Sequence, residues 1–212
     1  MIGMHYWEWI RARVAEEPGT PRVLDVGCGD GNTWRRGWHG QHAVEIPPEA
    51  VPAMDLWGLD ADDLADWPGH FVQGRAEALP FPDGRFDVVI ASQILEHVAD
   101  PVSVLREADR VLHPGGALIV TVPLGAHPDL ETDGDRLALA NPHIHYRQFI
   151  PDAEFPHHAH VRRFADLAEL RALLAGLPGR VVQAIQATCD GGPWAGAVWR
   201  RGKGVTRAYL AD

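Results

Sequence analysis

Two stretches of the chain hold residues whose types and spacing could do chemistry. The first is VLDVGCGDGNTW, in which Gly27, Gly29 and Gly31 follow a short apolar run. Glycines let the backbone approach a bound ligand closely, which side chains would prevent. The spacing is GxGxG with Asp25 before it, and it differs from the GxGxxG pattern that places a pyrophosphate on a helix N-terminus. We therefore expect a nucleotide-type turn here, but not one for NAD.

The second stretch, 142–164, is rich in histidine, which serves as metal ligand, general base or ordinary hydrogen-bonding group. Its histidines are His143, His145, His157, His158 and His160. The HxH and HHxH spacings occur without carboxylates in a recognised metal-binding pattern. We therefore predict no metal site, and keep a metal-assisted enzyme with this loop around the ion as an alternative.

Composition narrows the classes of partner. The 212 residues are 46% hydrophobic, enough for one well-buried domain, which we expect to span 1–212. The formal net charge of -10 disfavours a nucleic-acid partner and suits a neutral or cationic small molecule. The chain has two distant cysteines, no apolar run of membrane-spanning length and no signal-peptide pattern, so we expect a cytoplasmic protein that does not contact the membrane.

Apolar runs alternate with helical patterns along the chain. Short aliphatic runs, typical of strands buried on both faces, occupy 22–27, 41–46, 86–92 and 116–123, with a weaker edge strand at 70–75. Helical patterns occupy part of 1–17 and then 32–38, 48–56, 100–112 and 164–177. This alternation predicts a doubly wound, mostly parallel sheet. The runs 180–188 and 195–201 are close enough to form an antiparallel hairpin at the C-terminal end.

The run 41–46 ends at Glu45, where a carboxylate at the end of a second strand could accept from both hydroxyls of a ribose. Asp60, in LWGLDADD, is the alternative. A glycine turn alone is weak evidence for a nucleotide site, and a carboxylate at the next strand end strengthens it.

Four segments in order, VLDVGCGDG, VEIPPEAV, FVQGRAEALPFPDGRFDVVIASQILEHV and VLREADRVLHPGGALIVTVP, resemble the class I S-adenosylmethionine-dependent methyltransferases, and among them the small type-11-like group. The resemblance covers 22–123. It implies a Rossmann-like fold with a seven-stranded sheet, S-adenosylmethionine as cofactor, and methyl transfer to oxygen, nitrogen or carbon of a small-molecule acceptor.

The resemblance also implies roles for single residues. The cofactor-binding set is Asp25, Gly27, Cys28, Gly29 and Gly31 for the methionine part, Glu45 for the ribose, Arg75 and Ala76 beside the adenine, and Ser92, with Gln93 after it, near the sulfonium. Glu45 is preferred to Asp60 because VEIPPEAV matches the family's second strand end. Arg75 departs from the family, which has an acidic residue there; arginine donates only and could stack on the adenine ring.

The segment 124–163 leaves the fifth strand on the side of the glycine turn, so we expect it to form a lid over the substrate. Methyl transfer is an in-line displacement, for which alignment is the main task, and a proton-bearing acceptor would also use a general base. The candidate bases are His160, His145 and His97, and the candidate substrate contacts are Tyr6, Trp7 and Arg163.

Each of these roles has a plainer alternative. The lid histidines could be solvated, His97 could satisfy backbone groups at its turn, and the tryptophans could simply pack in the core. For the whole chain, the alternative to a methyltransferase is a relative that binds the cofactor without methylating, such as a cyclase or a scaffold.

Overall fold

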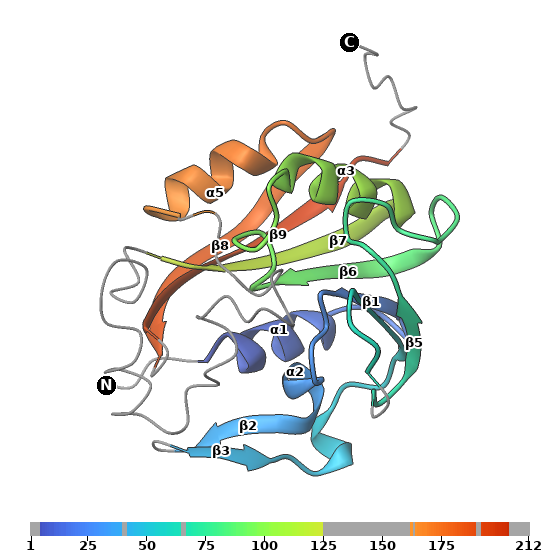
Figure 1. Ribbon diagram of the computed structural model, residues 1–212, viewed down its shortest axis with the longest axis vertical. Helices are drawn as coiled ribbons and strands as arrows, with labels where there is room; N and C mark the ends of the chain where they lie inside the picture. Colours follow the sequence, from blue (N-terminus) through green and yellow to red (C-terminus); the bar gives the residue numbers. More distant parts are fainter. Residues whose placement is uncertain are drawn as a thin grey trace.

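A seven-stranded sheet runs through the centre of the molecule in the computed structural model, which describes residues 5–39, 42–64, 67–124, 162, 164–189 and 192–203 (Figure 1). The strand order is β5-β4-β1-β6-β7-β9-β8. The strands are β1 (Arg22–Val26), β4 (Asp55–Asp60), β5 (His70–Gln73), β6 (Phe86–Ser92), β7 (Leu112–Pro123), β8 (Gly179–Cys189) and β9 (Gly192–Arg201). The first five are parallel to one another, and β9 joins β7 and β8 in antiparallel pairs. The predicted α/β fold class and the C-terminal hairpin are confirmed.

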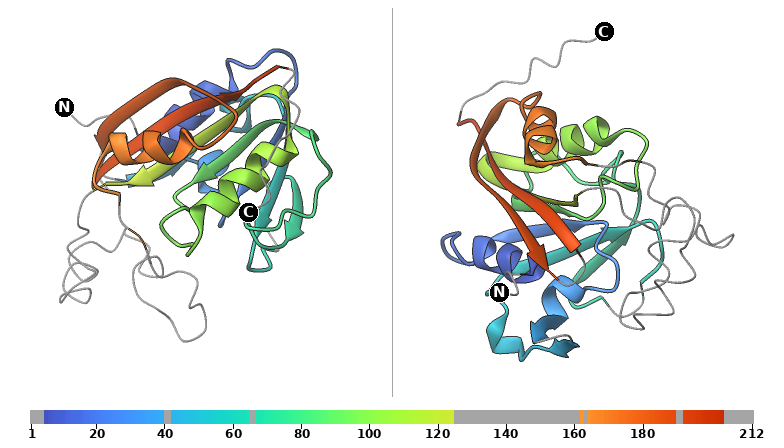
Figure 2. Two further views of the ribbon diagram at one scale, coloured as in Figure 1. Left: turned by 90° about the horizontal axis from the view of Figure 1, so that it is seen from above. Right: turned by 90° about the vertical axis from the view of Figure 1, so that its left-hand side faces the viewer.

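Helices cover both faces of the sheet (Figure 2). On one face lie α3 (Pro101–Val111) and α5 (Leu167–Leu174), which bury leucines such as Leu105 and Leu170 against the strands. On the other face α1 (Tyr6–Val14) packs Trp9 and Ile10 against β6, β7 and β9. Burying such side chains stabilises the fold by about 1.5 to 3 kcal/mol each.

The region between β1 and β4 departs from the prediction. The run 41–46 is not a strand of the main sheet, because β3 (His42–Glu45) pairs only with β2 (Arg36–His39) in a separate two-stranded hairpin. The helix expected at 32–38 is the single turn α2 (Asn32–Arg35), and the helix expected at 48–56 is reduced to the 3-10 turn η1 (Pro48–Ala50). Prolines at 47, 48 and 52 remove backbone donors that a longer helix would need.

The two neighbours of β1 in the sheet are β6 and, on its other side, β4. The sequence signal of β4 is weak because Gly58 interrupts its apolar run. A Cβ on Gly58 would lie 2.4 Å from Cε2 of Trp67, so this position admits only glycine while the indole packs there. β4 pairs with β1 in parallel from Arg22 opposite Asp55 to Val26 opposite Leu59. Asp60 therefore ends the strand beside β1.

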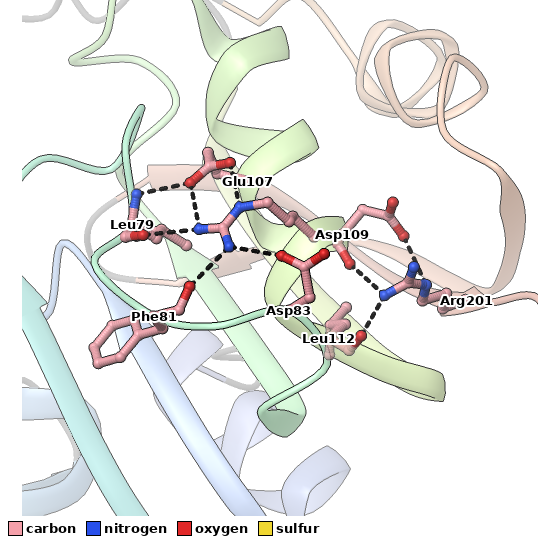
Figure 3. Close-up of polar contacts among 8 residues, drawn as sticks. Leu79, Phe81, Asp83, Glu107, Asp109, Leu112 and Arg201 are labelled. Atoms are coloured by element: carbon pink, nitrogen blue, oxygen red, sulfur yellow. Dashed lines mark hydrogen bonds and ion pairs between the residues drawn. The ribbon is translucent and has the colours of Figure 1, made fainter. Parts of the chain in front are cut away.

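The helix α3 matches its predicted limits because its first turn is capped locally. Asp100 accepts from the backbone N–H groups of Val102 and Ser103, and Pro101 occupies the first helical position. Further along, the guanidinium of Arg110 donates to the carbonyls of Leu79 and Phe81, at 2.7 Å each (Figure 3). This contact fastens the loop before β6 to the helix.

The predicted lid, 124–163, lies mostly outside the described residues. Its two ends are described: Leu124 forms a parallel bridge with Phe164, and the N–H of Arg162 donates to the carbonyl of Glu96 at 3.1 Å. The segment therefore leaves and returns beside the carboxyl ends of β6 and β7. None of the helices within the described ranges has the length and apolar character needed to cross a membrane.

Candidate active site

The glycine turn follows β1 at the carboxyl edge of the sheet. Its three glycines have φ angles of 68°, 50° and 76°, at Gly27, Gly29 and Gly31. The N–H groups of Gly27 and Cys28 donate to the carbonyl of Leu59, at 2.7 and 3.2 Å. A Cβ on Gly27 would lie 2.4 Å from Cδ1 of Ile94, whereas one on Gly29 would meet no atom within 4 Å. Hydrogen bonds to Leu59 thus hold the turn against the sheet, while the space beside the Gly29 backbone is free of other protein atoms.

Asp60, the alternative that the sequence analysis ranked second, stands beside this turn. One carboxylate oxygen accepts from the N–H of Gly29 at 2.9 Å, and the other from the N–H of Asp62 at 3.1 Å. Each oxygen keeps a second lone pair for a ligand.

The predicted position of Glu45 at the end of the second sheet strand is wrong. Its strand belongs to the hairpin, and the exposed Glu45 lines an open groove of about 930 Å³ with Trp34, Met54 and neighbouring residues. The sequence signal that could have favoured Asp60 is DLWGLD, a short run that ends in an acid directly before a loop.

Asp25 lies under the glycine turn with an exposed fraction of 2%. It accepts from the indole N–H of Trp34 at 2.8 Å. Burial raises the pKa of Asp25 to about 7; the Trp34 hydrogen bond opposes this rise and the charge of Asp60 adds to it. Burial also raises the pKa of the neighbouring Cys28 thiol, which therefore stays protonated and acts as a small apolar side chain.

The residues predicted to flank an adenine form a turn after β5. Ala76 is buried, whereas the Arg75 side chain is 75% exposed and pairs with Glu77 at 3.1 Å. This geometry leaves the small Ala76 on the inner side of the turn. The stacking role considered for Arg75 remains a prediction.

The ends of β6 and β7 bring together three polar side chains. The hydroxyls of Ser92 and Thr121 lie 2.8 Å apart, and the Gln93 amide nitrogen donates to the Thr121 hydroxyl at 3.2 Å. Gln93 has a φ of 53°, in the left-handed region that non-glycine residues seldom occupy. Such strain tends to collect at functional sites. Of this group the sequence analysis named Ser92 and Gln93 and did not name Thr121.

The next turn of chain holds Glu96 and His97. Glu96 is 1% exposed, and its Oε1 lies 3.9 Å from Nε2 of His97. The N–H of His97 donates to the carbonyl of Ile94 at 2.9 Å. His97, a predicted base, thus lies at the strand end, and the adjacent buried carboxyl is a functional candidate that the sequence analysis missed.

The two predicted substrate contacts of α1 lie at the start of the helix. Trp7 is buried, and its backbone N–H donates to Nδ1 of His5 at 3.3 Å. Tyr6 packs edge-on to Trp194, with ring centroids 6.2 Å apart. Burial, followed by the nearby negative charges of Cys189 and Glu96, raises the pKa of the Tyr6 hydroxyl. Tyr6 is partly buried against the core of this face, and Trp7 is buried beside the rings of His5 and Tyr6.

His145, His160 and Arg163 lie outside the described residues, as do His143, His157 and His158. Across the part of the chain that the structure does describe, no three His, Cys, Asp or Glu side chains gather in a way that could hold a metal ion.

Known proteins share this architecture. Residues 24–120 match a family described as a methyltransferase domain. A ubiquinone biosynthesis O-methyltransferase of Xanthomonas campestris pv. campestris (strain B100) is 36% identical over 117 residues, 54% of this chain and 47% of that protein. The corresponding protein of Xanthomonas oryzae pv. oryzae (strain PXO99A) is 36% identical over 103 residues, 47% of this chain and 42% of that one. The chain thus spans about half the length of the curated relatives it matches.

Solved structures resemble nearly the whole chain in fold. The 1,6-didemethyltoxoflavin-N1-methyltransferase of Burkholderia thailandensis, solved with 1,6-didemethyltoxoflavin and S-adenosylhomocysteine, has a TM-score of 0.62 at 15% identity, covering 93% of this chain and 76% of that one. The cyclase SpnF has a TM-score of 0.61 at 18% identity, covering 94% and 80%. At these identities the likeness concerns the fold. The match of residues 24–120, the O-methyltransferase relatives and the shared fold together support a class I S-adenosylmethionine-dependent methyltransferase.

Proposed function

We propose that this chain binds S-adenosylmethionine at the carboxyl ends of β1, β4 and β6 and transfers its methyl group to a small-molecule acceptor. The observation that carries the proposal is the 2.9 Å hydrogen bond between the Gly29 N–H and the Asp60 carboxylate, which joins an open glycine turn to an acid at the neighbouring strand end. The names of the relatives support the same chemistry.

The residues present fit this cofactor. The open backbone at Gly29 leaves room for a close approach, and Asp60 has acceptor capacity for a ribose diol. Asp60, beside the glycine turn, supplies negative charge for a ligand whose sulfonium is positive. When bound, S-adenosylmethionine supplies a methyl group already activated by positively charged sulfur.

The chain's own contribution is then alignment. Asp60 would hold the ribose, the glycine turn would hold the amino acid part, and Ala76 would border the adenine. The side chains of Ser92, Gln93 and Thr121 are hydrogen-bonded to one another and form a polar surface at the strand ends. Holding the two reactants in line can supply about 7 to 11 kcal/mol of the barrier reduction.

Calorimetric titration with S-adenosylmethionine and S-adenosylhomocysteine tests the proposal. Asp60→Ala is expected to weaken both affinities about 100-fold, because two hydrogen bonds to a charged group are worth about 1.5 kcal/mol each or more. Glu45→Ala is the matched control, an acid-to-alanine change at the position the sequence favoured, and should leave both affinities within twofold.

Other outcomes would change the proposal. Loss of binding in Glu45→Ala with normal binding in Asp60→Ala would contradict the assigned site. Absence of binding by the unaltered protein would contradict the proposed cofactor. Binding without turnover on a broad acceptor panel would favour a non-methylating relative, for which the fold likeness to a cyclase offers a precedent.

The remaining assignments stay predictions. We propose one methyltransferase domain over 1–212, with 124–163 as a substrate lid that carries His145, His160 and Arg163. The sequence leaves open whether the methyl group goes to oxygen, nitrogen or carbon. A cytoplasmic location remains a prediction of the sequence, and a metal-assisted enzyme remains its alternative.

A further inference from the structure

The groove of about 930 Å³ lies in a part of the fold where helices are missing. Parallel strands are usually joined by a crossover helix that covers the sheet. Here the connection from β1 to β4 holds only the single turn α2, the hairpin of β2 and β3, and η1 (Figure 1). The connection from β4 to β5 holds no helix among its described residues. The groove is lined from these two connections and from the start of β4, so it occupies a place that a helix would ordinarily fill.

The most buried residues of the lining are apolar. Trp34 is 3% exposed and Leu56 9%, and both belong to the buried cluster on the α1 side of the sheet. Val51 and Met54 are partly buried against the same cluster. Small-molecule sites are concave, mostly apolar and about 300 to 1,000 Å³ in volume, and this groove falls within that range.

Prolines form a large part of the remaining lining, at positions 48, 52 and 68. The proline ring fixes φ and removes the backbone N–H donor. Pro68 also packs beside the glycine turn, since a Cβ on Gly31 would lie 3.1 Å from its Cδ. These walls resist rearrangement and offer few backbone donors to an added strand, so they favour a compact ligand over an extended peptide.

The polar part of the lining is mainly acidic. Glu45 and Glu49 are exposed, and neither carboxylate has an ion-pair or hydrogen-bond partner among the described residues. The guanidinium of Arg35 also lines the groove and is unpaired within the same described ranges. Two acids thus face one base, in a chain whose formal net charge is -10. The resulting field favours a ligand with a positive group.

We propose that this groove binds a small amphipathic cation. Its apolar body would lie against Trp34, Met54 and Leu56, and its positive group would lie beside the two unpaired carboxylates. The combination of a buried apolar surface with exposed acids matches such a ligand in both shape and charge.

The groove is separate from the proposed cofactor site. Its lining includes the residue before β4 and the start of that strand, whereas Asp60 is the last residue of β4. The two ends of this strand are about 17 Å apart, at about 3.3 Å per residue. The inference therefore goes beyond methyl transfer and does not depend on it.

Calorimetric titration of the full chain with decyltrimethylammonium, kept below its micelle concentration, tests the proposal. Binding should be saturable with one site per chain. Decyl sulfate has the same tail and the opposite charge, and should bind about tenfold more weakly or worse. Tetramethylammonium lacks the tail and should bind about 100-fold more weakly or worse, because burial of the tail supplies most of the binding free energy.

Charge variants test the acids of the groove. Glu45→Gln combined with Glu49→Gln should weaken decyltrimethylammonium binding about three- to tenfold, as expected for exposed charges, and should not weaken decyl sulfate binding. Glu16→Gln combined with Asp83→Asn removes the same charge from exposed acids outside the lining and should stay within about twofold. Arg35→Gln removes the positive charge of the groove and should strengthen binding about threefold.

A variant that fills the groove tests its location. Ala53 is an exposed lining residue, so Ala53→Trp adds bulk there without removing an existing side chain. This change should weaken decyltrimethylammonium binding about 30-fold or more, since the apolar surface is then covered. Urea unfolding should show a stability within about 1 kcal/mol of the unaltered protein, as is usual for surface substitutions. Saturating S-adenosylhomocysteine should leave decyltrimethylammonium binding within about twofold, as for independent sites.

Four results would overturn the inference: no saturable binding of decyltrimethylammonium, equal affinities for decyltrimethylammonium and decyl sulfate, unchanged binding in Ala53→Trp, or displacement by S-adenosylhomocysteine, which would put the cation in the cofactor site. Failure of the unaltered protein to bind S-adenosylhomocysteine and S-adenosylmethionine would instead overturn the proposed function, and saturable cation binding would still support this inference.

Discussion

Replacing Arg201 with alanine is expected to lower the free energy of unfolding by about 3 to 5 kcal/mol, because it leaves a buried charge without its partner. Arg201 ends β9 with an exposed fraction of 8%, and its Nε lies 3.3 Å from the carboxylate of the fully buried Asp109 in α3. The guanidinium also donates to the carbonyls of Asp109, at 2.8 Å, and Leu112 (Figure 3). One side chain thus serves a buried acid and the last carbonyls of a helix.

The loss has two physical sources. Asp109 would keep its charge in a region that excludes water, or take up a proton at a cost. The carbonyls at the C-terminal end of α3 would lose a cationic donor, which also interacts favourably with the helix dipole. Because domains are stable by only about 5 to 15 kcal/mol, the change is a large part of the total.

Urea unfolding of Arg201→Ala and of Arg22→Ala measures this effect against a matched control. Arg22 pairs with Asp87 at 3.3 Å, but both side chains are well exposed, so its loss should cost less than about 1 kcal/mol. The double variant Arg201→Met with Asp109→Leu should recover much of the stability, because apolar pairs often replace buried ion pairs at little cost. Equal effects of Arg201→Ala and Arg22→Ala would contradict this account.

In the absence of cofactor, the protein is expected to lose stability as the pH rises from 5 to 8. Burial raises the pKa of Asp25 from 3.8 to about 7 and that of Glu96 from 4.5 to about 8. Both carboxyls therefore bind protons more tightly in the folded chain. Their contribution is fully present below the unfolded pKa values, and it is lost as the pH rises through the folded ones. Each group should lower the free energy of unfolding by about 1.4 kcal/mol per pH unit inside its window.

The decisive quantity is the slope of the free energy of unfolding between pH 5 and pH 7. Most proteins are near their maximum stability in this range, whereas this protein should lose stability as the pH rises. Asp25→Asn and Glu96→Gln cannot ionise, so each should remove the slope of one group, and the double variant should be nearly flat. Glu49→Gln should keep the original slope. A stability that does not change from pH 5 to pH 7 in the unaltered protein would show that the two carboxyls are not held protonated.

Several elements could be predicted because their signals are local. The Asp100 cap and Pro101 define the start of α3 within a few residues of chain. The glycine turn after an apolar strand indicates a backbone that a ligand approaches, and the two C-terminal runs are close enough in sequence to pair with each other.

The choice between Glu45 and Asp60 could not be made in this way. Both acids end a short strand, and a strand's own residues do not say which strand it pairs with. The parallel pairing of β1 with β4 joins residues that are distant in the chain, while β2 and β3 satisfy each other's backbone groups in a hairpin. Gly58 weakens the apolar signal of β4. A glycine is required there because the Trp67 indole fills the space that a side chain would need.

The sequence by itself thus determined the likeness to the methyltransferases, the sheet class and the position of the glycine turn, since these depend on runs of neighbouring residues. Only the tertiary structure decided which acid stands beside Gly29 and that the carboxyl of Glu96 is buried. Pairing between distant strands and the exclusion of water by distant side chains set the position and the pKa of a group such as Glu96, and neither is encoded in its immediate neighbours.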